Sequence, residues 1–223
     1  MFDSIAWRYD FLNHLLSFGI DRSWRKRAIS IISETHKNPN IIDVATGTGD
    51  LAFDAVKLDP VKITGIDISE KMLDLGKRKA QDKGLTGLIE FIKCDSENIC
   101  FEDGTFDVAM VAFGIRNFSD PLKGLTEMRR VLRKGGMTMV LEFSKPDGHF
   151  FKHAYDIYFR KLLPTIGGLF SKNRKAYRYL NESVMGFPSG EEFIELMRKA
   201  GFSGISHTRL TNGIASIYKG IKD

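Results

Sequence analysis

The stretch Ile41-Ile42-Asp43-Val44-Ala45-Thr46-Gly47-Thr48-Gly49-Asp50 decides the fold. Its first five residues are mostly apolar and β-branched, which predicts a buried strand, and the glycines predict a tight turn into a helix that begins near Leu51. Gly47 and Gly49 allow the sharp turn and bring backbone N–H groups toward a ligand at the start of that helix. Extended to Ala52, the stretch also satisfies the GxGxxA dinucleotide pattern, so by itself it does not choose between ligands.

Apolar runs and helical stretches alternate from about residue 40 onward, which predicts βαβ units and a parallel sheet. The predicted fold class is therefore α/β, a doubly wound and mostly parallel seven-stranded sheet that closes with an antiparallel C-terminal hairpin. Further strands are expected at 62–67, 88–93, 106–112, 137–143, 204–210 and 215–218, and helices after Ser69, over 121–132 and from Ser189 to Gly201.

The composition excludes several classes of protein. The 223 residues are 43% hydrophobic and 27% charged, which is ordinary for a globular domain and unlike a collagen-like, disordered or coiled-coil chain. No apolar run reaches the roughly 18 residues of a membrane span, and the first residues lack the layout of a signal peptide. We therefore expect a cytoplasmic or peripheral protein. Cys94 and Cys100 have neither CxxC spacing nor nearby histidines, so we predict no disulfide framework and no metal site.

The formal net charge of +5 is unevenly distributed along the chain. Residues 38–143 carry a net charge of −3, whereas residues 144–185 carry +5 and are rich in aromatic side chains. This distribution argues against a nucleic-acid partner. Within 144–185, apolar side chains recur at helical spacing among basic ones, so this segment is predicted to contact anionic lipid, each basic residue contributing about 1 kcal/mol. Packing of the same apolar stripe over the sheet is the alternative.

Acidic side chains follow the second and third predicted strands. Asp67 ends the second strand, where a carboxylate can accept hydrogen bonds from both hydroxyls of a ribose. Asp95 and Ser96 follow the third strand and are placed to bind an adenine edge. Each of these residues has a simpler alternative, a solvated acid for Asp67 and a turn cap for the other two. Together with the glycine turn they predict a nucleoside site.

These features, in this order, resemble a class I S-adenosylmethionine-dependent methyltransferase of Rossmann-like fold. Seven separated motifs narrow the resemblance to the UbiE/MenG/COQ5 family, which methylates a carbon of a quinone ring during menaquinone or ubiquinone biosynthesis. The motifs are YDFLNHLLSFGIDRSW (9–24), FGIRN (113–117), RVLRKGG (130–136), LEFSKP (141–146), AYDIY (154–158), PTIG (164–167) and YRYLNES (177–183).

The resemblance implies one methyltransferase domain over 1–223. Its parts are an N-terminal helical extension (1–37), a cofactor-binding core (38–143), a substrate lid (144–185) and a C-terminal helix and hairpin (186–223). It implies S-adenosyl-L-methionine as cofactor, with S-adenosyl-L-homocysteine as product, and a lipophilic polyprenyl quinol as substrate. We favour demethylmenaquinol; 2-polyprenyl-6-methoxy-1,4-benzoquinol is the alternative, and an NAD-dependent oxidoreductase is a remoter one. The predicted cofactor-binding residues are Gly47, Thr48, Gly49, Asp67, Asp95 and Ser96.

The predicted catalytic residues are Arg116, Asn117, Tyr155 and Asp156. The reacting ring carbon needs a phenolate, and a free phenol has a pKa near ~10, so a site that stabilises the phenolate gains rate at neutral pH. Arg116 is the first candidate, as a cation that stabilises the phenolate or orients a water, because arginine does not give up its proton in proteins. A structural salt bridge is the alternative role for Arg116.

The sequence departs from the usual family pattern at several positions. Asp21 stands where histidine is common, and Ala112 stands where some members carry a serine that contacts the cofactor. The resemblance also implies that the N-terminal helical region extends before Met1. A homodimer is compatible with the sequence, which does not decide it.

Overall fold

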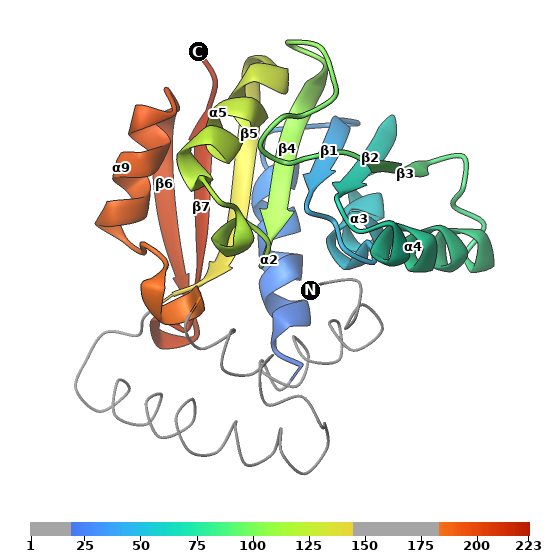
Figure 1. Cartoon of the computed structure of the whole chain (residues 1–223), viewed down its shortest axis with the longest axis horizontal. Helices are drawn as coiled ribbons and strands as arrows, with labels where there is room; N and C mark the ends of the chain where they lie inside the picture. Colours follow the sequence, from blue (N-terminus) through green and yellow to red (C-terminus); the bar gives the residue numbers. More distant parts are fainter. Residues whose placement is uncertain (1–18, 145–182) are drawn as a thin grey trace.

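The computed structural model describes residues 19–144 and 183–223. Figure 1 shows a single sheet with helices on both faces, and its strand order is β3-β2-β1-β4-β5-β7-β6. The pairs among β1 to β5 are parallel, and β7 is antiparallel to both β5 and β6. The predicted α/β sheet with its antiparallel hairpin is confirmed. The strands are β1 (Asn40–Val44), β2 (Lys62–Asp67), β3 (Ile89–Lys93), β4 (Phe106–Ala112), β5 (Leu132–Phe143), β6 (Ser203–Leu210) and β7 (Ala215–Ile221).

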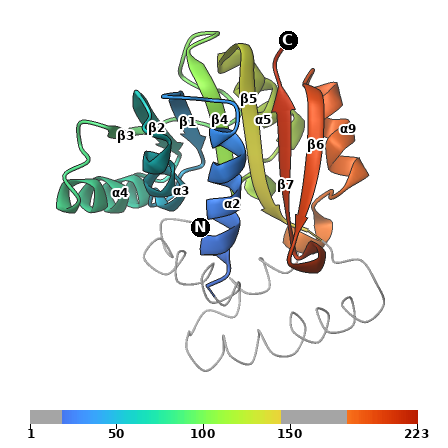
Figure 2. The same ribbon diagram turned by 180° about the vertical axis from the view of Figure 1, so that it is seen from behind.

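The sheet is covered by a different group of helices on each face. One core cluster joins α2, α3 and α4 to the sheet, and the other joins α5 and α9 to the opposite face. Figure 2 shows α2 crossing the face that is hidden in Figure 1. Because both faces are buried, the central strands read as continuous apolar runs. The helices are α2 (Asp21–Ser33), α3 (Asp50–Ala55), α4 (Glu70–Asp82), α5 (Pro121–Val131) and α9 (Glu191–Lys199), with short 3-10 turns η2 (Val56–Leu58), η3 (Ile115–Asn117) and η5 (Thr211–Gly213).

Most of the predicted boundaries agree with the structure to within a residue or two. The Ser69 hydroxyl caps α4 by accepting a hydrogen bond from the Met72 amide at 3.3 Å, as predicted. Ser189, predicted to begin the last helix, does not; α9 begins after Gly190, without a side-chain cap.

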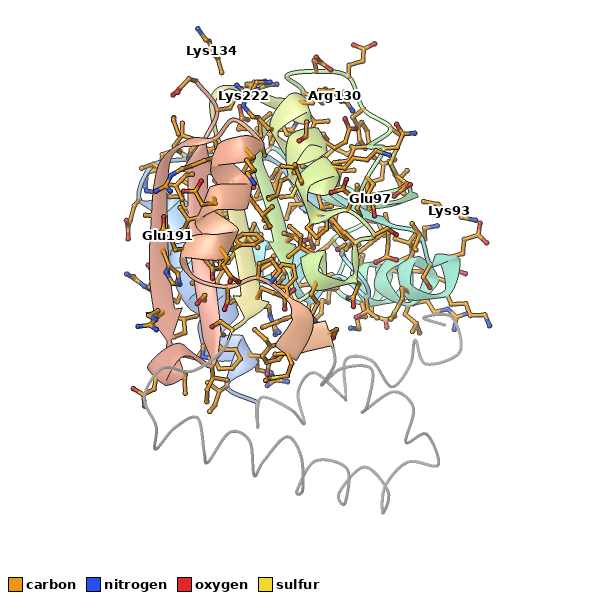
Figure 3. The ribbon with its side chains drawn as sticks, turned by 60° about the vertical axis from the view of Figure 1, so that its left-hand side comes forward. Lys93, Glu97, Arg130, Lys134, Glu191 and Lys222 are labelled. Carbon is orange, nitrogen blue, oxygen red and sulfur yellow. A yellow bond between two sulfur atoms is a disulfide. The ribbon has the colours of Figure 1, made fainter. Side chains whose placement is uncertain are left out.

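The start of β5 also differs from the prediction, which placed a helix over 121–132 and began the strand at residue 137. The strand already begins at Leu132, and its pairing with β4 shifts register between Phe106 and Val108. Lys222 fixes this start of the strand, because its ammonium donates to the carbonyls of Arg130 and Leu132 at 3.0 and 2.6 Å. Figure 3 labels Lys222 and Arg130 near each other at this end of the sheet. A strand that begins irregularly does not alternate apolar and polar side chains there, so the sequence pattern does not show where the strand starts.

Of the predicted lid, residues 145–182 lie outside the described ranges, as do residues 1–18 of the N-terminal extension. Within the described ranges, no helix is long and apolar enough to cross a membrane.

Candidate functional site

A cavity of 390 Å³ lies at the carboxyl ends of β1 to β4. This edge of an open α/β sheet is where ligands bind, since the strand order reverses between β1 and β4. The loops after these four strands supply most of its lining, and α2 supplies Asp21 and Arg25. All six predicted cofactor residues except Gly49 line it, and Gly49 is buried behind the turn.

The turn after β1 has the left-handed backbone that its glycines predict. Gly47 has a φ of 58° and Gly49 a φ of 89°, a region that side chains other than glycine seldom adopt. A Cβ on Gly47 would meet no atom within 4 Å, whereas one on Gly49 would lie 2.6 Å from the buried Phe91 ring. Gly47 therefore keeps space open at the cavity, and Gly49 allows the turn to pack on the core.

This contrast gives a first prediction. We expect Gly47→Ala to destabilise the fold by only about 1 to 2 kcal/mol, the cost of the left-handed backbone, while weakening cofactor binding because its methyl group enters the cavity. We expect Gly49→Ala to destabilise the fold by more than about 3 kcal/mol, because the strained left-handed backbone and the overlap of the new Cβ with the Phe91 ring both raise the free energy of the folded state. Urea unfolding of both variants checks this, and equal losses of stability would contradict the assignment.

Asp67 is oriented by the backbone of two neighbouring segments. Its carboxylate accepts hydrogen bonds from the amides of Gly47 and Ser69, both at 2.9 Å. Each carboxylate oxygen can accept a second hydrogen bond, so two ribose hydroxyls can still donate to it. The geometry thus holds the Asp67 side chain at the cavity, where its predicted role places it.

Thr48 is almost completely buried, at 2% exposure, although it lines the cavity. Its hydroxyl accepts a hydrogen bond from the ammonium of Lys79, which also binds Asp50 at 3.1 Å. Lys79 belongs to α4, so this contact joins the start of α3 to the next helix and positions the turn.

Asp95 and Ser96 lie in the loop after β3 and line the cavity. The carboxylate of Asp95 accepts a hydrogen bond from the Glu97 amide at 2.9 Å, and Ser96 is 7% exposed. The prediction that the cysteines form no disulfide is wrong here, because Cys94 and Cys100 are bonded. Their Cα atoms lie 6.0 Å apart, since the chain folds back through an antiparallel bridge between Asp95 and Asn98.

The cavity is strongly acidic. Among its described lining residues, six carboxyl groups face a single guanidinium, that of Arg25. Asp21, Arg25 and Asp43 also line the cavity and were not predicted from the sequence. The one signal for them was Asp21, which stands where histidine is common in the family. Arg25 binds Asp21 at 2.6 Å and Asp54 of α3 at 2.7 Å, which fixes α2 beside the glycine turn.

These residues fit S-adenosylmethionine. A sulfonium and an ammonium are favoured by carboxylates, whereas the phosphates of a dinucleotide would be repelled by them. The open space at Gly47 and the oriented carboxylate of Asp67 provide room for the ligand and an acceptor for its ribose. The lining therefore favours this cofactor over NAD.

Asp43 is a buried acid of the cavity whose pKa is shifted. It is 1% exposed, and burial raises its pKa to about 7, although the hydroxyl of Thr46 donates to it at 2.6 Å. An unfolded aspartate ionises near pH 3.9. The folded protein therefore binds one more proton than the unfolded chain between about pH 4 and pH 7, and this group lowers stability as pH rises through that interval.

A second prediction follows for Asp43→Asn. The free energy of unfolding of the wild-type protein, measured relative to that of Asp43→Asn, is expected to fall by up to a few kcal/mol as pH rises from about 4 to 7. Above pH 7 the difference should stay constant. Urea unfolding of both proteins at several pH values measures the difference. A difference that stays constant over this interval would show that Asp43 titrates normally.

Arg116 lies beneath the cavity and is absent from its described lining. Its guanidinium binds the Glu142 carboxylate at 2.9 Å, and both side chains are 1% exposed. It also donates to the carbonyl of Phe113, whose φ is 55°. These contacts support the alternative role, an ion pair that holds the turn after β4. Direct participation of Arg116 in the reaction stays a prediction.

Asn117, the second predicted catalytic residue, does line the cavity together with Ala112, Phe113 and Phe118. Tyr155 and Asp156 lie outside the described residues, and their roles stay predictions. Within the described part of the chain, no cluster of three or more histidine, cysteine or carboxylate side chains could hold a metal ion.

Two solved structures of the same fold carry the name of a methyltransferase. A "SAM-dependent methyltransferase, possible histamine N-methyltransferase" from Thermotoga maritima superposes with a TM-score of 0.69, covering 100% of this chain and 98% of its own, at 21% identity. Phosphoethanolamine N-methyltransferase 2 of Haemonchus contortus, solved with S-adenosyl-L-methionine, has a TM-score of 0.65 at 15% identity, covering 88% of this chain and 52% of its own. At these identities the similarity establishes the fold alone.

Sequence relatives are much closer. "Ubiquinone/menaquinone biosynthesis C-methyltransferase UbiE" of Geotalea daltonii is 51% identical, covering 100% of this chain and 94% of its own. "Demethylmenaquinone methyltransferase" of Thermus thermophilus is 46% identical over 99% of both chains, and the protein of the same name from Bacteroides fragilis is 45% identical over 100% of this chain and 91% of its own. The ubiE/COQ5 methyltransferase family model matches residues 1–222. The chain therefore belongs to the ubiE/COQ5 methyltransferase family.

Proposed function

We propose that the protein transfers a methyl group from S-adenosylmethionine to a ring carbon of a polyprenylated quinol, with demethylmenaquinol as the substrate. The observation that carries the proposal is the acidic cavity at the carboxyl ends of β1 to β4, which presents the glycine turn and Asp67 to a nucleoside. The names of the relatives from Bacteroides fragilis and Thermus thermophilus favour the naphthoquinol over the benzoquinol.

The cofactor would lie along the loops that follow β1, β2 and β3. Asp67 would hold the ribose, Asp95 and Ser96 the adenine edge, and Thr48 and the glycine-turn amides the methionine part. When bound, S-adenosylmethionine supplies a methyl group activated by a positively charged sulfur. The carboxylates that line the cavity lower the free energy of that charge before reaction and restrict which ligands enter.

The quinol ring would lie against the segment after β4. Phe113 and Phe118 offer apolar surface there, and Asn117 adds an amide that can donate to a ring oxygen. Hydrogen bonds to that oxygen stabilise the phenolate and so make the ring carbon a better nucleophile. The Arg116–Glu142 ion pair would keep this turn in place. Methylation breaks the carbon–sulfur bond, forms a carbon–carbon bond and releases the ring proton to water or a neighbouring base.

A ligand-binding experiment tests the cofactor half of the proposal. S-adenosylhomocysteine at 100 times its Kd should stabilise the protein by about 2.7 kcal/mol, and NADH at the same concentration should not. Thermal unfolding with each ligand gives the comparison. Stabilisation by NADH alone would overturn the proposed cofactor and revive the oxidoreductase alternative.

We also propose that residues 144–185 bring the enzyme to the membrane in which a prenylated quinol resides. The support is their charge of +5 and the apolar stripe formed by Phe151, Tyr155, Tyr158, Phe159 and Leu162 in the sequence. Sedimentation with vesicles of anionic phospholipid at low salt would show binding that salt reverses. Failure to sediment with the vesicles would contradict the proposed membrane contact. Light scattering of the protein without lipid would show whether it forms the homodimer that the sequence allows.

A further inference from the structure

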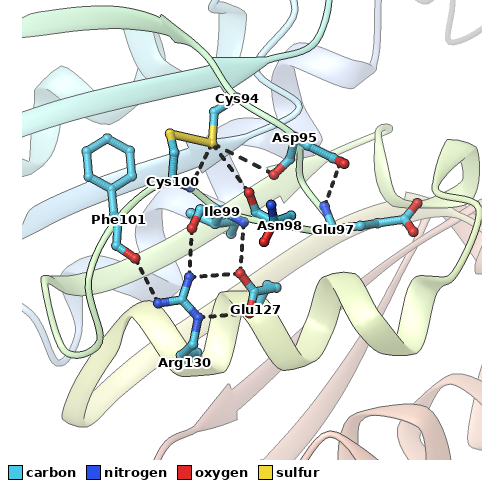
Figure 4. The surroundings of a disulfide bond; sticks show 9 residues. All are labelled: Cys94, Asp95, Glu97, Asn98, Ile99, Cys100, Phe101, Glu127 and Arg130. Carbon is cyan, nitrogen blue, oxygen red and sulfur yellow. Dashed lines mark hydrogen bonds and ion pairs between the residues drawn. A yellow bond between two sulfur atoms is a disulfide. The ribbon is translucent and has the colours of Figure 1, made fainter.

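The loop of residues 94–100 contains the Cys94–Cys100 disulfide as well as the proposed adenine contacts. It leaves β3 at Cys94, reverses at the Asp95–Asn98 bridge and returns to Cys100, where the disulfide closes it (Figure 4). The Cα–Cα distance of 6.0 Å lies within the usual range for a disulfide, so the bond forms without displacement of the backbone.

The two sulfur atoms differ in access. Cys100 is exposed, whereas Cys94 is 7% exposed, so a reagent in solution reaches Cys100 first. Arg130 of α5 donates to the carbonyls of Ile99 and Phe101 at 2.7 Å each, which places a guanidinium beside the residues that flank Cys100. The same guanidinium also binds Glu127 and Asp103, at 2.8 Å each, so its contacts hold the backbone on both sides of Cys100 in place.

The loop also accommodates the reduced state. A Cys94 thiol would have the carbonyls of Asp95 and Asn98 as acceptors, at 3.8 and 3.9 Å from its sulfur. The amide of Cys100 donates to the same sulfur at 2.9 Å. The same backbone therefore serves both redox states, as a reversible site requires.

We propose that Cys94 and Cys100 form a redox-modification site that takes low-molecular-weight disulfides and controls the order of the cofactor-binding loop. The Cys100 thiolate attacks one sulfur of the reagent disulfide, forming a mixed disulfide and releasing the first thiol. The Cys94 thiolate then attacks the Cys100 sulfur and releases the second thiol. The protein loses two electrons and two protons, and the reagent disulfide is reduced to two thiols.

The loop couples this chemistry to the cavity. Asp95, Ser96 and Glu97 lie between the cysteines and line the cavity. The Cys94 amide donates to the carbonyl of Asp67, and the Ile99 amide to Glu127 of α5, so the two ends of the loop are fixed to different elements. The disulfide joins these ends and limits the conformations of the residues between them. This inference rests on the proposed adenine contacts of Asp95 and Ser96.

The experiment uses the full-length protein, first reduced with dithiothreitol and then oxidised with glutathione disulfide. Because the sequence holds only two cysteines, thiol titration gives two reactive thiols before oxidation and none after it, without intermolecular crosslinks. Calorimetric titration with S-adenosylhomocysteine should give a Kd roughly 3- to 10-fold lower for the oxidised protein, since a preorganised loop loses less entropy on binding.

Two variants separate the steps. Cys94→Ser should stop at one stably bound glutathione on Cys100, seen by mass spectrometry. Cys100→Ser should keep the Kd of the reduced protein under both conditions. A Cys94→Ser protein that takes up no glutathione, or a wild-type Kd that oxidation leaves unchanged or raises, would overturn the inference alone. Binding of S-adenosylhomocysteine in neither state would overturn the proposed cofactor as well.

Discussion

Asp67→Asn is expected to raise the Kd for S-adenosylhomocysteine by roughly 30- to 100-fold, because hydrogen bonds to a charged acceptor are about twice as strong as neutral ones. The wild-type carboxylate accepts a backbone amide on each oxygen, and a carboxylate oxygen can accept more than one hydrogen bond, so both ribose hydroxyls can donate to it. An asparagine offers one acceptor atom and turns an N–H group toward the other hydroxyl. Calorimetric titration measures the change.

The ligand itself provides a control for this prediction. The 2′-deoxy analogue of S-adenosylhomocysteine should bind the wild-type protein more weakly than the parent ligand, while the two ligands should bind Asp67→Asn with nearly equal affinity. Asp74→Asn on the exposed surface of α4 should leave both affinities unchanged, since the Asp74 side chain is 65% exposed. An undiminished preference of Asp67→Asn for the ribose hydroxyl would contradict the assigned contact.

Glu142→Gln is expected to destabilise the protein by about 3 to 5 kcal/mol, because it removes the anion that pairs with the buried guanidinium of Arg116. Glu142 accepts hydrogen bonds from that guanidinium and from the Phe143 amide, at 2.9 and 2.8 Å. Burial raises the pKa of Glu142, and Arg116 opposes that shift by favouring the carboxylate. Urea unfolding measures the loss of stability.

The control for Glu142→Gln is an exposed ion pair in the same protein. Arg133, whose side chain is 52% exposed, binds Asp107 at 2.7 Å, and Arg133→Met should cost less than about 1 kcal/mol. Replacing both members of the buried pair, as Arg116→Met with Glu142→Leu, should recover much of the stability lost on removing one. If Glu142→Gln costs no more than Arg133→Met, the buried pair does not stabilise this turn.

A kinetic measurement separates structure from chemistry at Arg116. If Arg116 stabilises the phenolate, Arg116→Lys should lower kcat and move its pH profile toward the pKa of a free phenol, near ~10. If it only positions the turn, kcat should fall without a shift in pH dependence. If Arg116→Lys transferred methyl groups at the full rate and bound the quinol with normal affinity, Arg116 would not be the group that stabilises the phenolate.

The sequence was sufficient to predict the sheet and five of the residues that line the cavity, Gly47, Thr48, Asp67, Asp95 and Ser96. The bounds of β2 and β4 and the Ser69 cap follow from local patterns, since each depends on residues a few positions apart. Asp67 could be placed at the cavity because a parallel strand carries its last residue to the ligand-binding edge.

The remaining features depend on contacts between residues far apart in sequence. Arg25 binds Asp54 across 29 positions, and Arg116 binds Glu142 across 26, so neither pair could be identified before the strands were aligned. The Cys94–Cys100 disulfide escaped prediction for another reason, because it depends on how the loop between them reverses.

Methyl transfer from radiolabelled S-adenosylmethionine to a chemically reduced quinol tests the proposed function most directly. The reaction is run separately with demethylmenaquinol and with 2-polyprenyl-6-methoxy-1,4-benzoquinol, and the labelled lipid is identified by chromatography. We predict label in a ring methyl group of menaquinol, at a rate that falls in Asp67→Asn. Labelling of the benzoquinol alone would contradict the substrate, and labelling of neither quinol would contradict the function.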